Sequence, residues 1–133
     1  MVETIERLSY SITARRIILE TTIDLSGFIG TTAYHKSSLF SKMVHTDGVE
    51  SFASQAHAYW FLDICSTEIY EYAKRGEYFL SIKLVVVNNH AQILVNDGDD
   101  NPVFKKEIEF TDCPDGLYSF FLYDDVLMLT SEY

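Results

Sequence analysis

The chain has 133 residues, which suits one domain with a substantial core, and 47% of them are hydrophobic, which argues against global disorder. Its net charge of −10 is unevenly distributed, because residues 1–45 carry +1 and residues 46–133 carry −11. A duplex-binding surface needs more basic than acidic residues, so direct nucleic-acid binding by the main body is disfavoured. The acidity indicates solubility or, as the alternative, an acidic surface that competes with nucleic acid for a basic protein.

The cysteines and the chain start indicate the compartment. Cys65 and Cys113 lie far apart and form no C-x-x-C pair, so we expect two free, buried thiols in a reducing cytoplasm. The first residues lack the pattern of a signal peptide, and no apolar run approaches the length of a membrane span. We therefore expect a cytoplasmic protein that does not contact a membrane.

Residues 1–27 are predicted to form an N-terminal arm with a helix over residues 13–26, although their β-branched content argues equally for a strand. The arm is a candidate dimerisation element, which makes a homodimer one expected state. Residues 28–45 follow as a loop rich in Gly, Ser and Thr. The apolar residues expected to anchor this loop on the core are Phe28, Tyr34, Leu39 and Phe40.

The stretch over residues 46–76 carries both a helix start and a helix stop. At its start, Asp47 and Glu50 have the spacing of a capping box, and Thr46 offers a second cap. At its end, two cations precede Gly76, which is typical of a helix C-terminus. We therefore expect helical structure throughout this stretch.

A single helix across that stretch would be about 40 Å long, which is long for a domain of this size. The apolar stripe also changes sides, because Val49 and Phe52 share one helix face whereas Phe61 lies roughly opposite. The pattern therefore predicts a bend, with helices over about residues 47–56 and 58–75.

From residue 78 onward the apolar period changes from 3.6 to 2 residues, which predicts an antiparallel meander of about five strands. In the third strand, Phe104, Ile108 and Phe110 are expected to face the core, with Lys106 as an exception. The predicted fold is α+β, with two to three helices packed on one face of this sheet in a single domain. The predicted strands span residues 79–87, 91–96, 103–110, 117–123 and 126–130.

The chain shows no recognisable metal, cofactor or catalytic motif. The four histidines lack the spacing of a zinc site, and no phosphate-binding glycine pattern or nucleophile elbow occurs. Residues 97–101 resemble the opening of a calcium loop, but Pro102 and Ile108 stand where that loop needs Gly and Glu. We therefore expect a hairpin turn there, no cofactor, no metal and no catalytic residue.

Residues at and after the predicted bend are the candidates for ligand or partner binding. Asp63 lies inside an apolar run, so it is expected to be partly buried and to need a hydrogen-bond donor, with a structural role as the first interpretation. A histidine at this place is more often a helix-terminal residue than a ligand or base. The candidates are His57, Tyr59, Trp60 and Asp63.

Several motifs stand out along the chain: Phe28-x-Gly30-Thr31, Tyr34, Leu39, Thr46-Asp47-Gly48-Val49, Ala53, Ala58-Tyr59-Trp60-x-x-Asp63 and Leu127-x-Leu129-x-Ser131-Glu132-Tyr133. Together they resemble a family of small uncharacterised proteins found in bacteria, including cyanobacteria, and on phages and plasmids. The resemblance covers residue 28 to the end, and it implies a mobile-element or accessory context without supplying catalytic residues. Its members often carry Gly where this chain has His57, which implies a helix end and a positive φ there.

Three functional hypotheses follow, and the first is our prediction. In this first hypothesis, the protein is a non-enzymatic interaction protein whose acidic, aromatic surface binds another protein. An inhibitor that mimics nucleic acid is one form of such a protein. The second hypothesis is a small-molecule-binding domain with a pocket between helices and sheet, near Tyr59 and Trp60. The third is a small enzyme using Asp63 with His57 or His35, which requires these side chains to converge within hydrogen-bond reach.

Overall fold

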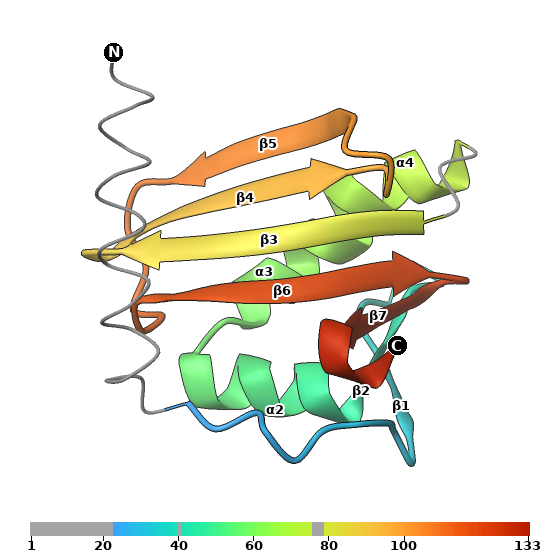
Figure 1. Ribbon diagram of the computed structural model, residues 1–133, viewed down its shortest axis with the longest axis horizontal. Helices are drawn as coiled ribbons and strands as arrows, with labels where there is room; N and C mark the ends of the chain where they lie inside the picture. The colour runs from blue at the N-terminus through green and yellow to red at the C-terminus, as the bar shows by residue number, and fades with distance from the viewer. Residues whose placement is uncertain (1–22, 40, 76–78) are drawn as a thin grey trace.

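The structure is a computed structural model that describes residues 23–39, 41–75 and 79–133. It shows an α+β protein, as predicted, in which two helices are combined with a seven-stranded sheet. In Figure 1 the helical segments α3 (Tyr59–Ile64) and α4 (Tyr70–Lys74) lie behind the sheet, whereas the C-terminal turn η2 (Thr130–Glu132) lies in front of it. No helix within the described ranges is long and apolar enough to cross a membrane.

The predicted bend in the central stretch is confirmed. The first helix, α2, spans Asp47–Ala56. The second runs on through α3 (Tyr59–Ile64), the π-helical turn η1 (Cys65–Ile69) and α4 (Tyr70–Lys74). The turn between the helices lets each bury its own apolar face, which is why the stripe changes sides in the sequence. The buried apolar residues are Val49, Phe52, Ala53 and Ala56 in α2, and Phe61, Leu62, Cys65, Ile69 and Tyr70 in the second helix.

The predicted cap at Thr46 is confirmed, because Thr46 is the N-cap of α2, and the predicted capping box of Asp47 and Glu50 is wrong. Its Oγ1 accepts a hydrogen bond from the N–H of Val49 at 3.3 Å. Asp47 is instead the first helical residue, and the Glu50 side chain bonds to His45 and Tyr59. Both acidic side chains are thereby free to hold other parts of the chain.

His57 ends α2 in the left-handed conformation, with φ of 52°. We expect His57→Gly to raise the free energy of unfolding by roughly 0.5–1 kcal/mol, because glycine adopts this conformation without the Cβ penalty. His57→Val should lower it by about 1 kcal/mol, since a β-branched residue fits a positive φ poorly. Urea unfolding of the three proteins measures both effects, and a destabilising glycine would contradict the assignment.

The sheet has seven strands in the order β1-β2-β7-β6-β3-β4-β5, so the predicted strand number of five was too low. The two extra strands come from the segment predicted as a loop, and β2 pairs in parallel with β7, so the sheet is mixed. Each extra strand has three residues, too few for a period of 2 to stand out. The strands are β1 (Tyr34–Lys36), β2 (Val44–Thr46), β3 (Phe79–Val87), β4 (His90–Asn96), β5 (Pro102–Ile108), β6 (Gly116–Tyr123) and β7 (Val126–Leu129).

The strands do not form a simple meander, because β6 pairs with β3 and leaves β5 at the edge. The connection from β5 to β6 crosses the end of the β3–β4 hairpin and is fixed there. The Thr111 N–H donates to the Asn89 carbonyl at 2.8 Å, and the Asn88 N–H donates to Asp115 Oδ1 at 3.0 Å. The inner position suits β6 because its alternate residues are buried, whereas every residue of β5 is at least partly exposed.

The predicted hairpin turns are confirmed. Residues 88–89 and 124–125 have φ between 51° and 65°, as a two-residue type I′ turn requires. In the β4–β5 turn, Asp97 Oδ1 accepts hydrogen bonds from the N–H groups of Asp99 and Asn101 at 2.9 and 3.2 Å. The segment that resembles a calcium loop is therefore a hairpin turn, and the carboxylate of Asp97 accepts hydrogen bonds within that turn.

The apolar core fills the space between helices and sheet. Phe52 packs against Phe61, Tyr118 and Phe120, with ring centroids 4.8–6.1 Å apart. In β5, Phe104 and Ile108 pack against this core as predicted, but Phe110 is 68% exposed because the strand ends before it. Lys106 also faces the helices and pairs with Glu68 at 3.1 Å, which explains the predicted exception.

The N-terminal predictions are only partly covered by the described residues. Residues 1–22 lie outside them, and residues 23–26 are not helical, so the predicted helix over 13–26 is wrong for its described end. Ile23 is nevertheless buried in the core. Of the predicted loop anchors, Phe28 packs against the core, Tyr34 and Leu39 are exposed, and Phe40 lies outside the described residues.

Candidate functional site

Within the described ranges, no hydrogen bond or ion pair joins any two of the four predicted site residues. His57 and Asp63 are exposed, so the predicted partial burial of Asp63 is wrong, and Trp60 packs half-buried against the core. In the described part of the chain, no hydrogen bond or ion pair joins Asp63 to His57 or His35. Tyr59 alone belongs to a larger polar group.

The carboxylate of Glu132 closes the N-terminus of α2. It accepts hydrogen bonds from Thr46 Oγ1 at 2.6 Å, from the Gly48 N–H at 3.2 Å and from the Leu129 N–H at 2.9 Å. A helix N-terminus offers unpaired N–H groups and a positive dipole end, both of which favour a carboxylate. We call Thr46, Gly48, Leu129 and Glu132 the C-terminal latch, since they tie the end of the chain to α2.

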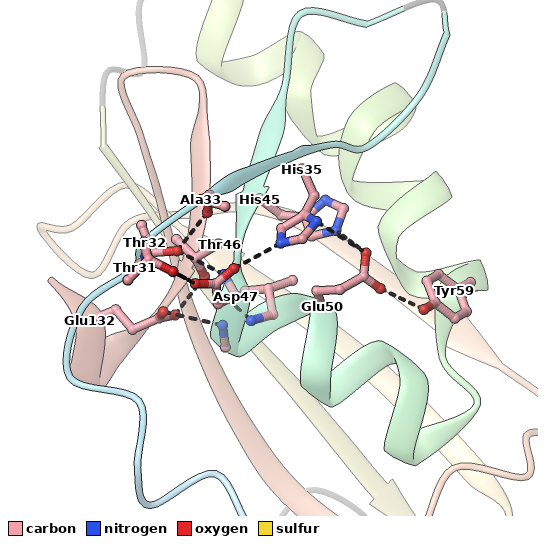
Figure 2. Close-up of polar contacts among 12 residues, drawn as sticks. Thr31, Thr32, Ala33, His35, His45, Thr46, Asp47, Glu50, Tyr59 and Glu132 are labelled. Atoms are coloured by element: carbon pink, nitrogen blue, oxygen red, sulfur yellow. Dashed lines mark hydrogen bonds and ion pairs between the residues drawn. The ribbon is translucent and has the colours of Figure 1, made fainter.

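Asp47 fixes the segment that precedes β1 (Figure 2). Its Oδ2 accepts hydrogen bonds from the N–H and the Oγ1 of Thr32, both at 2.9 Å, and its own N–H donates to Thr31 Oγ1. Its Oδ1 accepts a hydrogen bond from His35 Nε2 at 2.9 Å. The bond from His35, followed by those from Thr32, holds the pKa of Asp47 well below its usual range.

The rings of His35 and His45 stack with centroids 5.4 Å apart beside α2 (Figure 2). His45 is 2% exposed and has a partner on each nitrogen. Its Nε2 lies 3.2 Å from Glu50 Oε1 and its Nδ1 lies 2.7 Å from Ser37 Oγ. These partners assign a neutral imidazole that donates from Nε2 to the carboxylate and accepts the serine hydroxyl at Nδ1.

Tyr59 closes this group by donating its hydroxyl to Glu50 Oε2 at 2.5 Å. Burial lowers the pKa of His45, although the hydrogen bond to Glu50 opposes that effect. Burial raises the pKa of Glu50, but hydrogen bonds from Tyr59 and His45 outweigh it and leave that pKa lowered. The bond to Glu50 raises the pKa of Tyr59. We call His35, His45, Asp47, Glu50 and Tyr59 the histidine–carboxylate cluster.

The chain of bonds from Ser37 through His45 to Glu50 has the connectivity of a serine hydrolase triad. A working triad also needs free donors for an oxyanion, but the Ser37 N–H donates to the Met43 carbonyl. His45 is almost fully buried, and no buried side-chain N or O atom in the described residues lacks a partner. The described residues also contain no group of three His, Cys, Asp or Glu side chains that could hold a metal ion. This geometry supports a structural network.

A groove of about 500 Å³ lies away from the predicted pocket position. Its lining includes Lys42, Tyr70, Lys74 and Asp125, and Tyr70 donates its hydroxyl to Asp125 at 2.8 Å. Beside Trp60, the layer between helices and sheet holds Phe61, whose ring contacts Phe120 and Phe52. Packed rings thus adjoin Trp60 in this layer, and the described groove lies elsewhere.

Both cysteines are free and buried, as predicted. Burial raises the pKa of Cys65 well above its usual value. Burial, reinforced by the charge of Asp115, raises the pKa of Cys113 to about 12. Neither thiol therefore has the lowered pKa of a reactive cysteine.

Four aromatic rings gather on the sheet face opposite the helices. Phe79 of β3 and Phe121 and Tyr123 of β6 point to this face, because the alternating residues of both strands are buried against the helices. Tyr133 joins them from the C-terminal turn η2 (Thr130–Glu132), with its centroid 5.4–6.3 Å from theirs. We call these four residues the aromatic surface cluster.

The cluster is open to solvent at its outer side. Tyr133 is 70% exposed and Tyr123 is 46% exposed. Tyr133 is also held in place by its neighbours, because Ser131 Oγ donates to the Phe28 carbonyl at 2.6 Å and Glu132 forms the latch. An exposed aromatic group on a fixed turn suits a contact surface, since ordering it on binding costs little further entropy.

A family model described as a family of unknown function, DUF6876, matches residues 19–133. The chain belongs to this family. No curated protein and no solved structure shows significant similarity to it. The DUF6876 match begins nine residues before the resemblance noted in the sequence and includes the latch, the histidine–carboxylate cluster and the aromatic surface cluster.

Sequence reasoning missed most of the residues that this DUF6876 protein brings together. His35, His45 and Glu50 come from three elements, and only the unpredicted β1–β2 hairpin places them side by side. Part of the aromatic surface cluster could have been predicted from the sequence, since Phe121 and Tyr123 alternate with the buried residues Phe120 and Leu122. The pairing of β3 with β6, which the sequence did not predict, is what adds Phe79 to them.

Proposed function

We propose that this DUF6876 protein is a non-enzymatic accessory protein that binds another protein through its aromatic surface cluster. The observation that carries the proposal is the gathering of four rings on the sheet face opposite α2, α3 and α4, with Tyr133 70% exposed. Aromatic residues are enriched in the centres of protein interfaces, because a ring buries a large area while few rotors are ordered.

The two polar clusters are hydrogen-bonded within the protein itself, which supports the aromatic surface cluster as the contact surface. The hydrogen bonds of the histidine–carboxylate cluster join β1, β2 and α2 to one another. In the latch, the carboxylate of Glu132 is bonded to the start of α2. The latch therefore fixes the C-terminal turn that carries Tyr133, and the cluster fixes the β1–β2 hairpin against α2. A fixed contact residue loses less entropy on binding than a mobile one, which favours affinity.

The wider context belongs to the same proposal. We place the protein in the bacterial cytoplasm. Its gene belongs to a bacterial genome or to a phage or plasmid, as the resemblance of its motifs implies. Two free buried thiols agree with a reducing compartment. A nucleic-acid-mimicking inhibitor is the more specific form, supported by the charge of −11 over residues 46–133, and it requires that duplex DNA competes with the protein for its partner.

Co-purification from the native host tests the proposal. The tagged full chain is compared with Tyr123→Ala/Tyr133→Ala and with Tyr34→Ala, a control tyrosine that is 63% exposed on β1. We expect the double variant to recover a partner at least about tenfold less well than the other two proteins, because hot-spot aromatics contribute about 2 kcal/mol or more.

Equal thermal unfolding midpoints of the three proteins exclude a folding defect as the cause. The same partner recovered equally by all three proteins would contradict the proposal, as would a partner lost only with Tyr34→Ala.

A further inference from the structure

We infer that the aromatic surface cluster binds a basic, arginine-containing segment of its partner. This inference rests on the proposed function and adds the chemistry of the partner to it. Three observations carry it: an acidic turn against one side of the rings, a second acidic turn beside them, and two exposed rings whose faces suit a planar cation.

The β4–β5 turn lies against the first side of the cluster. A Cβ placed on Gly98 would lie 3.1 Å from Cδ1 of Phe79, so the turn touches that ring. Asp97 is occupied within the turn, but Asp99 and Asp100 are exposed. Neither carboxylate has a hydrogen-bond or ion-pair partner among the described residues. Two negative charges are therefore available next to Phe79.

The β6–β7 turn supplies the second side. Asp124 follows Tyr123 directly in the chain and is exposed, with φ of 51°. Asp125 faces the helical side instead, because its Oδ1 accepts the hydroxyl of Tyr70 at 2.8 Å. The carboxylate of Asp124 has no partner within the ranges that the structure describes. The rings thus lie between turns that each offer unpaired carboxylates.

The ring geometry favours a cation between these turns. Tyr123 and Tyr133 have centroids 6.3 Å apart and planes at 82°, and 46% and 70% of these residues are exposed, so a cation can approach both rings. A cation near such faces is attracted by the ring quadrupole, and a neighbouring carboxylate adds a charge-assisted hydrogen bond. Arginine fits better than lysine, because its planar guanidinium stacks on a ring and still donates to a carboxylate.

The charge of the whole chain works in the same direction. With a net charge of −10, the protein attracts a basic segment over a Debye length and repels an acidic one. Such steering raises the association rate, while the rings and the nearby carboxylates hold the bound segment.

Fluorescence anisotropy with defined peptides tests the inference on the full chain. The probes are labelled ten-residue peptides in which glycine alternates with arginine, lysine or glutamate. We expect the arginine peptide to bind most tightly and the glutamate peptide not to bind. Tyr123→Ala/Tyr133→Ala should weaken arginine-peptide binding at least about tenfold, and Asp99→Asn/Asp124→Asn should weaken it about threefold to tenfold at low salt.

The matched control is Glu109→Gln/Asp112→Asn, which removes the same charge from exposed positions in the β5–β6 connection. It should change the affinity less than Asp99→Asn/Asp124→Asn does under the same conditions, because this connection lies at the β3–β4 hairpin, at the opposite end of β3 from Phe79, and Coulomb attraction weakens with distance. Equal weakening by both charge variants, unchanged binding by the tyrosine variant, or no binding of the arginine peptide would each overturn the inference. In all three cases the proposed function still stands if co-purification of the native partner depends on Tyr123 and Tyr133.

Discussion

Gly48→Ala is expected to lower the free energy of unfolding by about 2–3 kcal/mol, although alanine normally stabilises a helix by up to about 1 kcal/mol relative to glycine. The reason is the C-terminal latch. A Cβ at this position would lie 2.6 Å from Glu132 Oε1 and 2.6 Å from Leu129 Cδ1, so the carboxylate must move away. Its three hydrogen bonds to the start of α2 and to β7 would then be lost or lengthened.

A double-mutant cycle measured by urea unfolding separates the latch from general crowding. Glu132→Ala alone should cost about 2–3 kcal/mol, because it leaves Thr46 and two backbone N–H groups without their acceptor. In that background Gly48→Ala should cost at least about 1 kcal/mol less than in the native chain. The control Glu71→Ala, which removes an exposed carboxylate of α4, should change stability by less than about 0.5 kcal/mol. Additive effects of Gly48→Ala and Glu132→Ala would contradict the latch.

Acidification should destabilise the protein in two successive steps, of which His45 accounts for the first. Its folded-state pKa is lowered, so the unfolded chain binds more protons as the pH falls below the ordinary histidine value of about 6.5. The stability that it contributes is therefore complete above that value and declines toward the folded-state pKa, by at most about 1.4 kcal/mol per pH unit.

The second step comes from Asp47 and Glu50, whose folded-state pKa values are also lowered. Their contribution is present above the unfolded values near pH 4 and is lost as the pH falls further. The free energy of unfolding, measured by urea titration from pH 8 to pH 3, should therefore fall throughout the acidic range.

His45→Gln identifies the source of the first step. Glutamine cannot titrate, so the variant should lose the decline that begins near pH 6.5 and keep the one that begins near pH 4. The control His90→Gln changes an exposed histidine at the start of β4 and should keep both declines. A first decline that persists in His45→Gln would show that another group causes it.

The sequence was most informative where local chemistry decides the structure. The hairpins at residues 88–89 and 124–125 could be predicted because Asn and Asp tolerate the positive φ that these turns need. The bend at His57 could be predicted because the apolar stripe changes sides there. In both cases a few neighbouring residues carry the whole signal.

The sequence was least informative where distant segments meet. The β1–β2 hairpin, the return of β6 to β3 and the bonds of Glu132 to α2 depend on contacts across 8 to 86 positions. Local propensity and period carry no information on such pairings. These long-range pairings bring together the histidine–carboxylate cluster and the aromatic surface cluster. Of the predicted site residues, only Tyr59 therefore belongs to one of the two clusters.

Site-directed photo-crosslinking in the native host tests the central claim most directly. A photoreactive phenylalanine analogue replaces either Tyr123 in the aromatic surface cluster or the control Tyr34, and each full chain is irradiated in cells. We expect a covalent adduct with one partner protein from position 123 and none with that partner from position 34. An adduct from position 34 alone, or the same adduct from both positions, would contradict binding through the aromatic surface cluster.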